Sequence, residues 1–346
     1  MNKDQSSTGE PISGEKKLAS ELRFNPVCKD WVVIATGRAR RPETFAVEKK
    51  IATSTSAGEC PFCDIKTQEV PVLINRDEKG EWTLVVVPNK FPAFTPEGSL
   101  HKKTESLYVS INGIGFHEVV ITRNHDLQIN MPEFPAEKIE EVIDAYQKRY
   151  LALMSEELVN YVSIFHNHGK EAGASITHPH SQIIAIPVTD PDIRRSLDGS
   201  QHFFETQGKC IHCAMIKWDR QDKKRIIFEN EKFVVLCPFA SKVAFEVRIY
   251  PKEHNPYFER IDDDGKKQLA EALKVALNKI HKGLNDPPFN FFIHTSPCDG
   301  NDYSHYHWHL VILPKTSVWA GFELGTGIEI STIEPERAAE YLREIK

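Results

Sequence analysis

Two closely spaced cysteine pairs are the clearest candidates for chemistry in this chain. They are Cys60-Pro-Phe-Cys63 and Cys210-Ile-His-Cys213. A tetrahedral zinc site takes four nitrogen or sulfur ligands, and a C-x-x-C turn supplies two of them. A redox pair usually precedes a helix in a βαβ unit, and we expect neither pair to do so. The pattern therefore predicts two structural metal sites, completed by distant histidines: the candidate ligands are Cys60, Cys63, His125 and His178 in the first, and Cys210, Cys213, His254 and either His305 or His307 in the second.

A histidine-rich strand, His178-Pro179-His180-Ser181-Gln182, could carry a reaction. The two-residue period of a strand puts His178, His180 and Gln182 on one face. With His178 on a metal, a hydrogen bond from one His180 nitrogen to a carbonyl would leave the other free to attack phosphorus. Gln182 could donate a hydrogen bond to a phosphate oxygen. The alternative is that H-x-H belongs to a second metal cluster or a buried polar patch.

These residues lie in a chain that reads as two copies of one design. Each half has a C-x-x-C pair, a β-like run with a Pro-containing aromatic turn, a strand ending in histidine, an amphipathic helix and a histidine-rich strand. The helical faces are Ile139, Val142, Ile143, Tyr146 and Tyr150 in the first half, and Leu269, Ala272, Leu273, Ala276 and Ile280 in the second. We expect an α+β fold in which helices pack on an antiparallel or mixed sheet. The predicted division is a loose tail over 1–20, a first half over 21–190 and a second half over 205–346, with a join near 189–208, where Asp, Pro, Gly and Ser cluster.

The ligand from the second histidine-rich strand stays open at this point. Alignment of the two strands on Pro187 and Pro314 pairs His178 with His305 and His180 with His307. Alternation instead puts His305, His307 and His309 on one face. Either of the first two could reach a metal.

Composition limits the classes of protein that fit. The chain is 40% hydrophobic and 27% charged, with a net charge of −6, which is typical of a globular protein. A surface built for nucleic acid needs a basic face, which this charge does not favour. No apolar run approaches the roughly 20 residues that span a bilayer, and the polar start is unlike a signal peptide. We expect a cytoplasmic protein.

Several segments resemble the galactose-1-phosphate uridylyltransferase family of the histidine triad superfamily. The resemblance runs from about Glu21 to the C-terminus and is closest to the branch with two zinc sites, which includes plant ADP-glucose phosphorylase. The matching segments are ELRFNPVCKDWVVIATGRARRPETF, CPFCD, GFHEVVITRNHD, GASITHPHSQ, GKCIHC, LNDPPFNFFIHTSP and AGFELGTGIEI. The chain departs from bacterial members in having Ser181 before the glutamine, and in carrying a second cysteine pair where they have an iron site.

The resemblance implies a duplicated histidine-triad-like fold, zinc, a homodimer and a covalent nucleotidyl-histidine on His180. UDP-glucose would lose glucose 1-phosphate, and galactose 1-phosphate would then accept the UMP group. The family's second-site histidine, next to a tryptophan, matches His307. Carried over by position, the residues that line the nucleotide-sugar pocket are Arg38, Arg41, Asn89, Asn167, Gly173, Ser175, Gln182, Gly321, Phe322 and Glu323.

Two other functions compete with uridylyl transfer. The first keeps His180 but uses ADP-glucose with inorganic phosphate as acceptor, or a diadenosine polyphosphate. The second is a non-catalytic zinc protein that binds nucleic acid or a partner protein; it leaves the HPHSQ strand without a purpose. Because only the first half carries H-x-H-x-Q, we expect one active site per chain, with the segment 321–323 completing it across a dimer.

Overall fold

The computed structural model describes residues 20–35, 60–123 and 130–346. Its centre is a ten-stranded sheet in the order β10-β11-β12-β14-β13-β8-β9-β7-β4-β3, and every neighbouring pair in it is antiparallel. The expected α+β fold on an antiparallel sheet is therefore confirmed. The strands of this sheet are β3 (Leu73–Arg76), β4 (Trp82–Pro88), β7 (Phe116–Thr122), β8 (Tyr161–His168), β9 (His180–Ile186), β10 (Ile226–Glu229), β11 (Phe233–Leu236), β12 (Val247–Pro251), β13 (Phe289–His294) and β14 (His309–Pro314).

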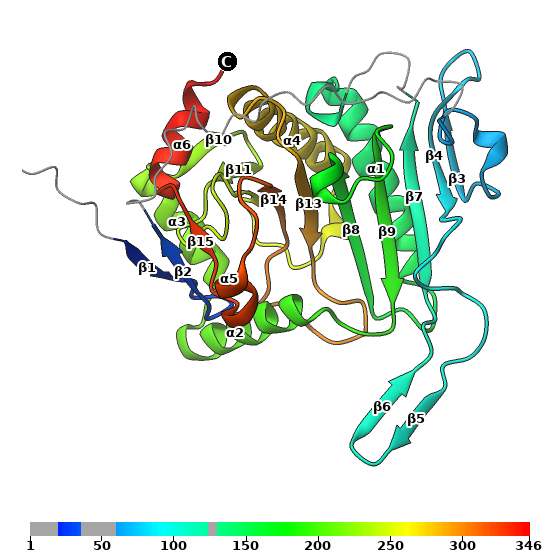
Figure 1. Cartoon of the computed structure of the whole chain (residues 1–346), viewed down its shortest axis with the longest axis horizontal. Helices are drawn as coiled ribbons and strands as arrows, with labels where there is room; N and C mark the ends of the chain where they lie inside the picture. Colours follow the sequence, from blue (N-terminus) through cyan, green and yellow to red (C-terminus); the bar gives the residue numbers. More distant parts are fainter. Residues whose placement is uncertain (1–19, 36–59, 124–129) are drawn as a thin grey trace, which may run out of the picture.

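Two long helices cover one face of this sheet, α1 (Ala136–Leu153) and α4 (Asp263–Gly283), and they lie behind it in Figure 1. The apolar stripes predicted for both helices are buried in the main core. Burying each large apolar side chain contributes roughly 1.5–3 kcal/mol. Asp262 caps α4 by accepting the Gly265 N–H, 2.7 Å away, and the capped helix holds its face against the sheet.

The two halves meet across β8 and β13 and are related by a local twofold axis. Phe165 of β8 pairs with Phe292 of β13, while Ile164 pairs with Ile293 and His166 with Phe291. This pairing is symmetric about the two phenylalanines. Outward from this seam the strand order is the same in both directions, β8-β9-β7-β4-β3 and β13-β14-β12-β11-β10. The duplication is therefore visible in the pairing itself.

The join between the halves differs from expectation, because residues 191–207 form helix α2 (Pro191–Gln207). Asp190 accepts the N–H groups of Asp192 and Ile193, Pro191 opens the helix, and Gly208 ends it in the left-handed conformation. The Asp, Pro and Gly that suggested a loop are thus the boundary signals of a helix. Cys210 is the residue directly before α3 (Ile211–Asp222) and makes no side-chain cap hydrogen bond. The second cysteine pair thus precedes a helix, but this helix follows α2 and not a strand, so it is not the βαβ arrangement of a redox pair.

The remaining elements lie around the sheet. In Figure 1 the helices α2 and α5 lie in front of its second half, and a two-stranded hairpin, β5–β6, projects from the body. A small sheet has the order β1-β2-β15, and the last element of the chain is helix α6. No helix in the described part of the chain is both long enough and apolar enough to span a membrane. The bounds are β1 (Glu21–Phe24), β2 (Trp31–Ile34), β5 (Lys102–Glu105), β6 (Tyr108–Ile111), α5 (Gly321–Thr326), β15 (Ile330–Ser331) and α6 (Pro335–Glu344).

Candidate active site and metal centres

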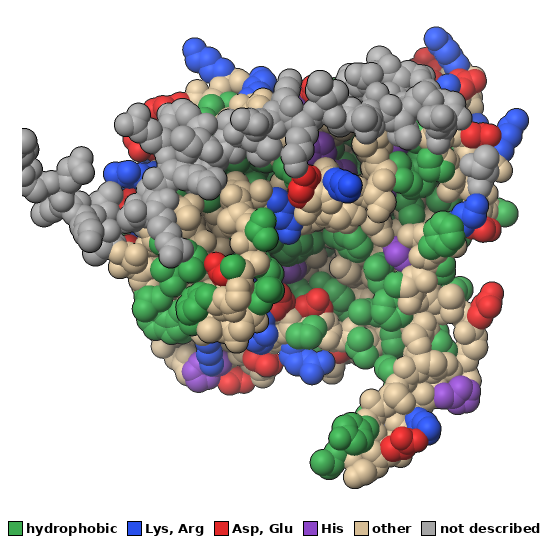
Figure 2. All heavy atoms as spheres, viewed as in Figure 1, with side chains coloured by type: hydrophobic (Ala, Val, Ile, Leu, Met, Phe, Trp, Pro, Cys, Tyr) green, Lys and Arg blue, Asp and Glu red, His purple; other side chains and the backbone are tan. Residues whose placement is uncertain are grey.

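The face of the sheet opposite α1 and α4 carries the predicted catalytic strand. Along β9, burial alternates so that Ser181 and Ile183 are buried on the helix side, while His180 and Gln182 are half-buried on the other face. Figure 2 shows that this front face is hollowed at its centre, with histidine and hydrophobic side chains in the hollow. The sheet therefore presents His180 and Gln182 on the face where a ligand can enter.

His180 begins β9 and is held in one orientation. Its Nδ1–H donates to the carbonyl of His178 at 2.9 Å, which is the type of hydrogen bond expected from the sequence. The ring of Phe62, from the first C-x-x-C turn, meets it edge-on with centroids 5.0 Å apart. Burial lowers the pKa of His180 below its ordinary 6.5, so the ring is neutral at pH 7. The free Nε2 lone pair is therefore available as a nucleophile.

Gln182 is held by a residue that the sequence analysis missed. The ring of His117, on β7, lies with its Nε2 2.8 Å from Gln182 Oε1. Asn89, at the end of β4, has its Nδ2 3.0 Å from the same nitrogen. Nothing marks His117 in a single sequence except its place in an alternating strand, because its partners come from two other strands.

Three further predicted pocket residues lie in or beside the turn that follows β8. Asn167 is half-buried on the same face of β8 as Phe165, which pairs with Gln182 of β9. Its Oδ1 accepts a hydrogen bond from Asn290 Nδ2 of β13, 2.7 Å away. Gly173 has a φ of 91°, a left-handed conformation that favours glycine, and Ser175 is exposed two residues later. His166 pairs with Ser181, so the end of β8, from which this turn leaves, lies beside the start of β9.

Ser181, between His180 and Gln182 on β9, points the other way. Tyr146 of α1 donates to its Oγ at 2.5 Å, and His166 Nδ1 is 3.1 Å from the same atom. Its side chain is in the core and takes no part in the hollow.

Near His180, the sulfurs of Cys60 and Cys63 face a histidine nitrogen. They lie 3.5 and 3.7 Å from Nδ1 of His178, and these three residues could together hold a metal ion. The Nε2–H of His178 donates to the carbonyl of Thr122 at 2.6 Å, so Nδ1, which faces the two sulfurs, is the nitrogen that would bind the metal. The fourth predicted ligand, His125, lies outside the described residues.

The second group is complete, and His307 is the histidine that joins it. Cys210, Cys213, His254 and His307 have their ligand atoms within 4.8 Å of one another, and Cys213 Sγ lies 3.4 Å from Nδ1 of both histidines. Their Nε2 atoms donate to carbonyls, at 2.8 Å from His254 to Ser304 and 3.0 Å from His307 to Pro251. His305 is not in the group.

Both groups fit zinc by the separation of their donor atoms. Bond lengths of about 2.3 Å to sulfur and 2.0–2.1 Å to nitrogen, at a tetrahedral angle, put these donors about 3.5 Å apart. The sulfur-to-nitrogen distances of 3.4 to 3.7 Å agree with this value. Hydrogen bonds from Cys213, and then from His254 and His307, hold the pKa of the Cys210 thiol below its ordinary value, which favours the thiolate that binds metal.

The local twofold axis corrects the alignment on prolines. His309 begins β14 as His180 begins β9, and its Nδ1 donates to the carbonyl of His307 at 3.2 Å. His307 therefore corresponds to His178, and His309 to His180, because β9 runs two residues further before its proline than β14 does. The counterpart of Gln182 is then Val311, which cannot donate a hydrogen bond. His309 is also only 2% exposed, so the second half lacks an equivalent site.

Other predicted pocket residues lie apart from His180 or outside the described chain. Gly321, Phe322 and Glu323 form the first turn of α5, which lies over the other half of the front face from β9 (Figure 1). Phe322 is 49% exposed. Arg38 and Arg41 are outside the described residues.

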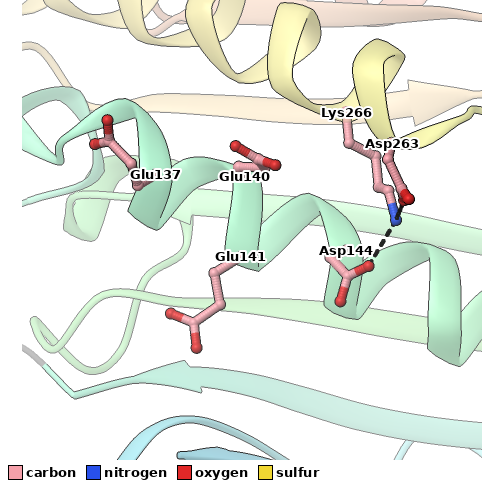
Figure 3. A pocket seen from close by; sticks show the side chains of 6 residues that line it. All are labelled: Glu137, Glu140, Glu141, Asp144, Asp263 and Lys266. Carbon is pink, nitrogen blue, oxygen red and sulfur yellow. Dashed lines mark hydrogen bonds and ion pairs between the residues drawn. The ribbon is translucent and has the colours of Figure 1, made fainter. Parts of the chain in front are cut away.

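A pocket on the helix side is unsuited to a nucleotide. It lies between α1 and the start of α4 (Figure 3), and five carboxylates and one lysine line it: Glu137, Glu140, Glu141, Asp144, Asp263 and Lys266. Lys266 already pairs with Asp144 and Asp263, at 2.7 Å to each. The net negative charge of this lining repels phosphate.

The sequence of this chain matches known protein families. Residues 11–189 match the family model described as galactose-1-phosphate uridyl transferase, N-terminal domain. The chain belongs to the galactose-1-phosphate uridylyltransferase family. Residues 209–324 also match a model described as scavenger mRNA decapping enzyme C-term binding. Membership in the uridylyltransferase family makes the protein a nucleotidyltransferase.

Relatives in this family extend over almost the whole chain. An ADP-glucose phosphorylase from Arabidopsis thaliana is 36% identical over 94% of this chain and 93% of its own length. A galactose-1-phosphate uridylyltransferase from Thermotoga maritima is 30% identical over 94% and 98%. Among solved structures, the Arabidopsis phosphorylase with bound ADP-glucose superposes with a TM-score of 0.79 at 34% identity, covering 95% of this chain and all of that one. A uridylyltransferase structure gives 0.71 at 27% identity, covering 94% and 97%.

Proposed function

We propose that the protein is a UDP-glucose:hexose-1-phosphate uridylyltransferase, with galactose 1-phosphate as the acceptor, and that it works by two displacements at His180. The observation that carries the proposal is the orientation of His180. Its pKa is lowered by burial, its Nδ1–H is bound to the His178 carbonyl, and its Nε2 is free. Those are the requirements of a neutral nitrogen nucleophile.

The two steps balance without an external proton carrier. In the first, Nε2 attacks the α-phosphorus of UDP-glucose, the N–P bond forms, and the P–O bond to glucose 1-phosphate breaks. The ring becomes positively charged, and the Nδ1–H bond to the His178 carbonyl stabilises that charge. In the second, a phosphate oxygen of galactose 1-phosphate attacks the same phosphorus and the N–P bond breaks. In both steps the carboxamide of Gln182 donates to the charged phosphoryl oxygens.

We further propose that each Cys/His group binds Zn²⁺ as a structural ion, with His125 as the fourth ligand of the first group. The tetrahedral donor spacing and the ligand tautomers support this assignment. The first zinc would fix Phe62 against His180 through the C-x-x-C turn. The seven cysteines all lie in described residues and none is in a disulfide, which is consistent with a cytoplasmic enzyme. We also propose a homodimer in which the exposed first turn of α5 reaches the hollow of the second copy, with Arg38 and Arg41 binding phosphate.

A second candidate, ADP-glucose phosphorylase, is favoured by a specific observation. The relative with 36% identity carries that name, and its solved structure contains ADP-glucose. The same histidine would then take an AMP group and pass it to inorganic phosphate. The two candidates differ in the base bound and in the acceptor, and not in the nucleophile.

The mass of the intact protein separates the candidates. Zinc-loaded protein is incubated with UDP-glucose or with ADP-glucose, without acceptor, and weighed under mildly basic conditions that preserve a phosphoramidate. A UMP-sized adduct supports the uridylyltransferase and an AMP-sized adduct the phosphorylase. His180→Asn should abolish the adduct, while His309→Asn, its counterpart in the second half, should retain it. No adduct with either nucleotide would refute covalent catalysis and favour the non-catalytic zinc protein.

A further inference from the structure

His117 contacts three groups around the catalytic glutamine. The backbone N–H of Ala93 donates to its Nδ1 at 3.1 Å. Its Nε2 faces Gln182 Oε1 at 2.8 Å and Asn89 Nδ2 at 3.0 Å. No other imidazole in the described chain is hydrogen-bonded to Gln182.

These contacts determine where the proton of His117 lies. A backbone N–H can only donate, so Nδ1 of His117 is an acceptor and the proton of the neutral ring is on Nε2. Asn89 cannot take that proton, because the Phe91 N–H bound to its Oδ1 at 2.9 Å orients the amide so that Nδ2, which can only donate, faces His117. Gln182 Oε1 is therefore the acceptor of the His117 Nε2–H.

We propose that His117 is a positioning residue that fixes the orientation of the Gln182 carboxamide, an inference that rests on the proposed function. With Oε1 bound to His117, the NH₂ group of Gln182 is turned away from β7 and toward the hollow beside His180. A free carboxamide could rotate by 180° and present its oxygen to the phosphate, which would repel the negative charge. His117 thus keeps the donating end of Gln182 on the side where charge develops.

The test compares two replacements of similar size. His117→Gln keeps a side-chain N–H donor near the position of Nε2, whereas His117→Leu has none. We expect His117→Leu to slow formation of the nucleotidyl adduct roughly 10- to 100-fold at saturating nucleotide, since removal of one such donor from a transition state costs about 10²–10³-fold. The KM should change little, and His117→Gln should restore most of the rate. Equal loss in both variants would overturn the proposal.

A double-variant comparison separates positioning from general damage. In a Gln182→Ala background there is no carboxamide to orient, so adding His117→Leu should slow adduct formation less than about twofold further. If the two losses multiply instead, His117 acts independently of Gln182 and the proposal fails. Unfolding transitions of all variants are measured in parallel.

The tautomer gives a readout that does not depend on activity. In protein labelled with ¹⁵N-histidine, long-range proton–nitrogen spectra distinguish a proton on Nε2 from one on Nδ1. The His117 signals, assigned with His117→Leu, should show the Nε2–H form, and an Nδ1–H form would contradict the inference. If the wild-type protein forms no nucleotidyl adduct, the proposed function is rejected, but the tautomer of His117 can still be measured. Failure of the proposed function and failure of this inference are therefore distinguishable.

Discussion

Gly199, inside helix α2, is buried in contact with a backbone carbonyl. A Cβ atom built on it would lie 1.8 Å from the oxygen of Val27 and 2.9 Å from its carbon. Ordinary carbon-to-oxygen contacts are about 3.3–3.6 Å, so Gly199→Ala must push α2 and the 25–30 turn apart by more than an ångström. Both sides are backbone, which cannot rotate away as a side chain can.

Two effects oppose each other in this substitution. Alanine in a helix interior is favoured over glycine by roughly 0.5–1 kcal/mol, while overpacking costs typically 1–3 kcal/mol and occasionally more. We expect the overlap to win and the free energy of unfolding to fall by about 1–3 kcal/mol. Gly325 of α5 is the matched control, because a Cβ there meets nothing within 4 Å, so Gly325→Ala should be neutral or slightly stabilising. Urea unfolding measures both, and Gly199→Ala as stable as Gly325→Ala would refute the reasoning.

Three further expectations concern the core, pH and metal. Arg149 donates to both carboxylate oxygens of Glu118, at 2.6 and 2.8 Å, and Glu118 is only 4% exposed. Arg149→Met leaves this buried charge unpaired, so the free energy of unfolding in urea should fall by about 3–5 kcal/mol. Adding Glu118→Gln removes the charge and should recover part of that loss. Burial holds the pKa of His166 well below 6.5, so the unfolded chain takes up a proton that the folded one refuses. The contribution of His166 to stability should fall as the pH drops below 6.5, by about 2 kcal/mol at pH 5, and a His166→Gln variant should lose that part of the pH dependence. Chelation of zinc should raise hydrogen exchange in α3 before the rest of the chain unfolds, and unchanged protection there would argue against a structural metal.

The sequence predicted the features that are local or repeated. The apolar stripes of α1 and α4 depend on a period of 3.6, and the C-x-x-C pairs on a spacing of three, so both can be read without knowing what they pack against. His180 and Gln182 were assigned to one side of a strand on the same basis, and both lie on one face of β9. The same assignment was wrong for His178, which lies in a bend before β9 begins. The resemblance to known sequences added His307.

The rest depended on contacts between distant segments. His117 acquires its role only when β7 pairs with β9, which a single sequence does not reveal. The pairing of His178 with His305 was wrong because the two prolines are not equivalent positions. β9 runs two residues further before its proline than β14 does, and a single sequence does not show this difference. Helix α2 was missed because Asp, Pro and Gly are common both in loops and at helix ends. Asp190, Pro191 and Gly208 are recognised as helix boundaries only when the residues between them are known to be helical.

The seam between β8 and β13 has a consequence for how such a chain can fold and arise. Each half on its own would end in a bare strand whose N–H and C=O groups invite pairing with another copy. Because Phe165 and Phe292 pair about a twofold axis, the natural partner for that strand is an identical one. The chain is in this sense a symmetric dimer joined into one polypeptide, and the join turns a concentration-dependent association into an intramolecular step. Once linked, the halves could diverge, so that one retained Gln182 while the other replaced it with Val311.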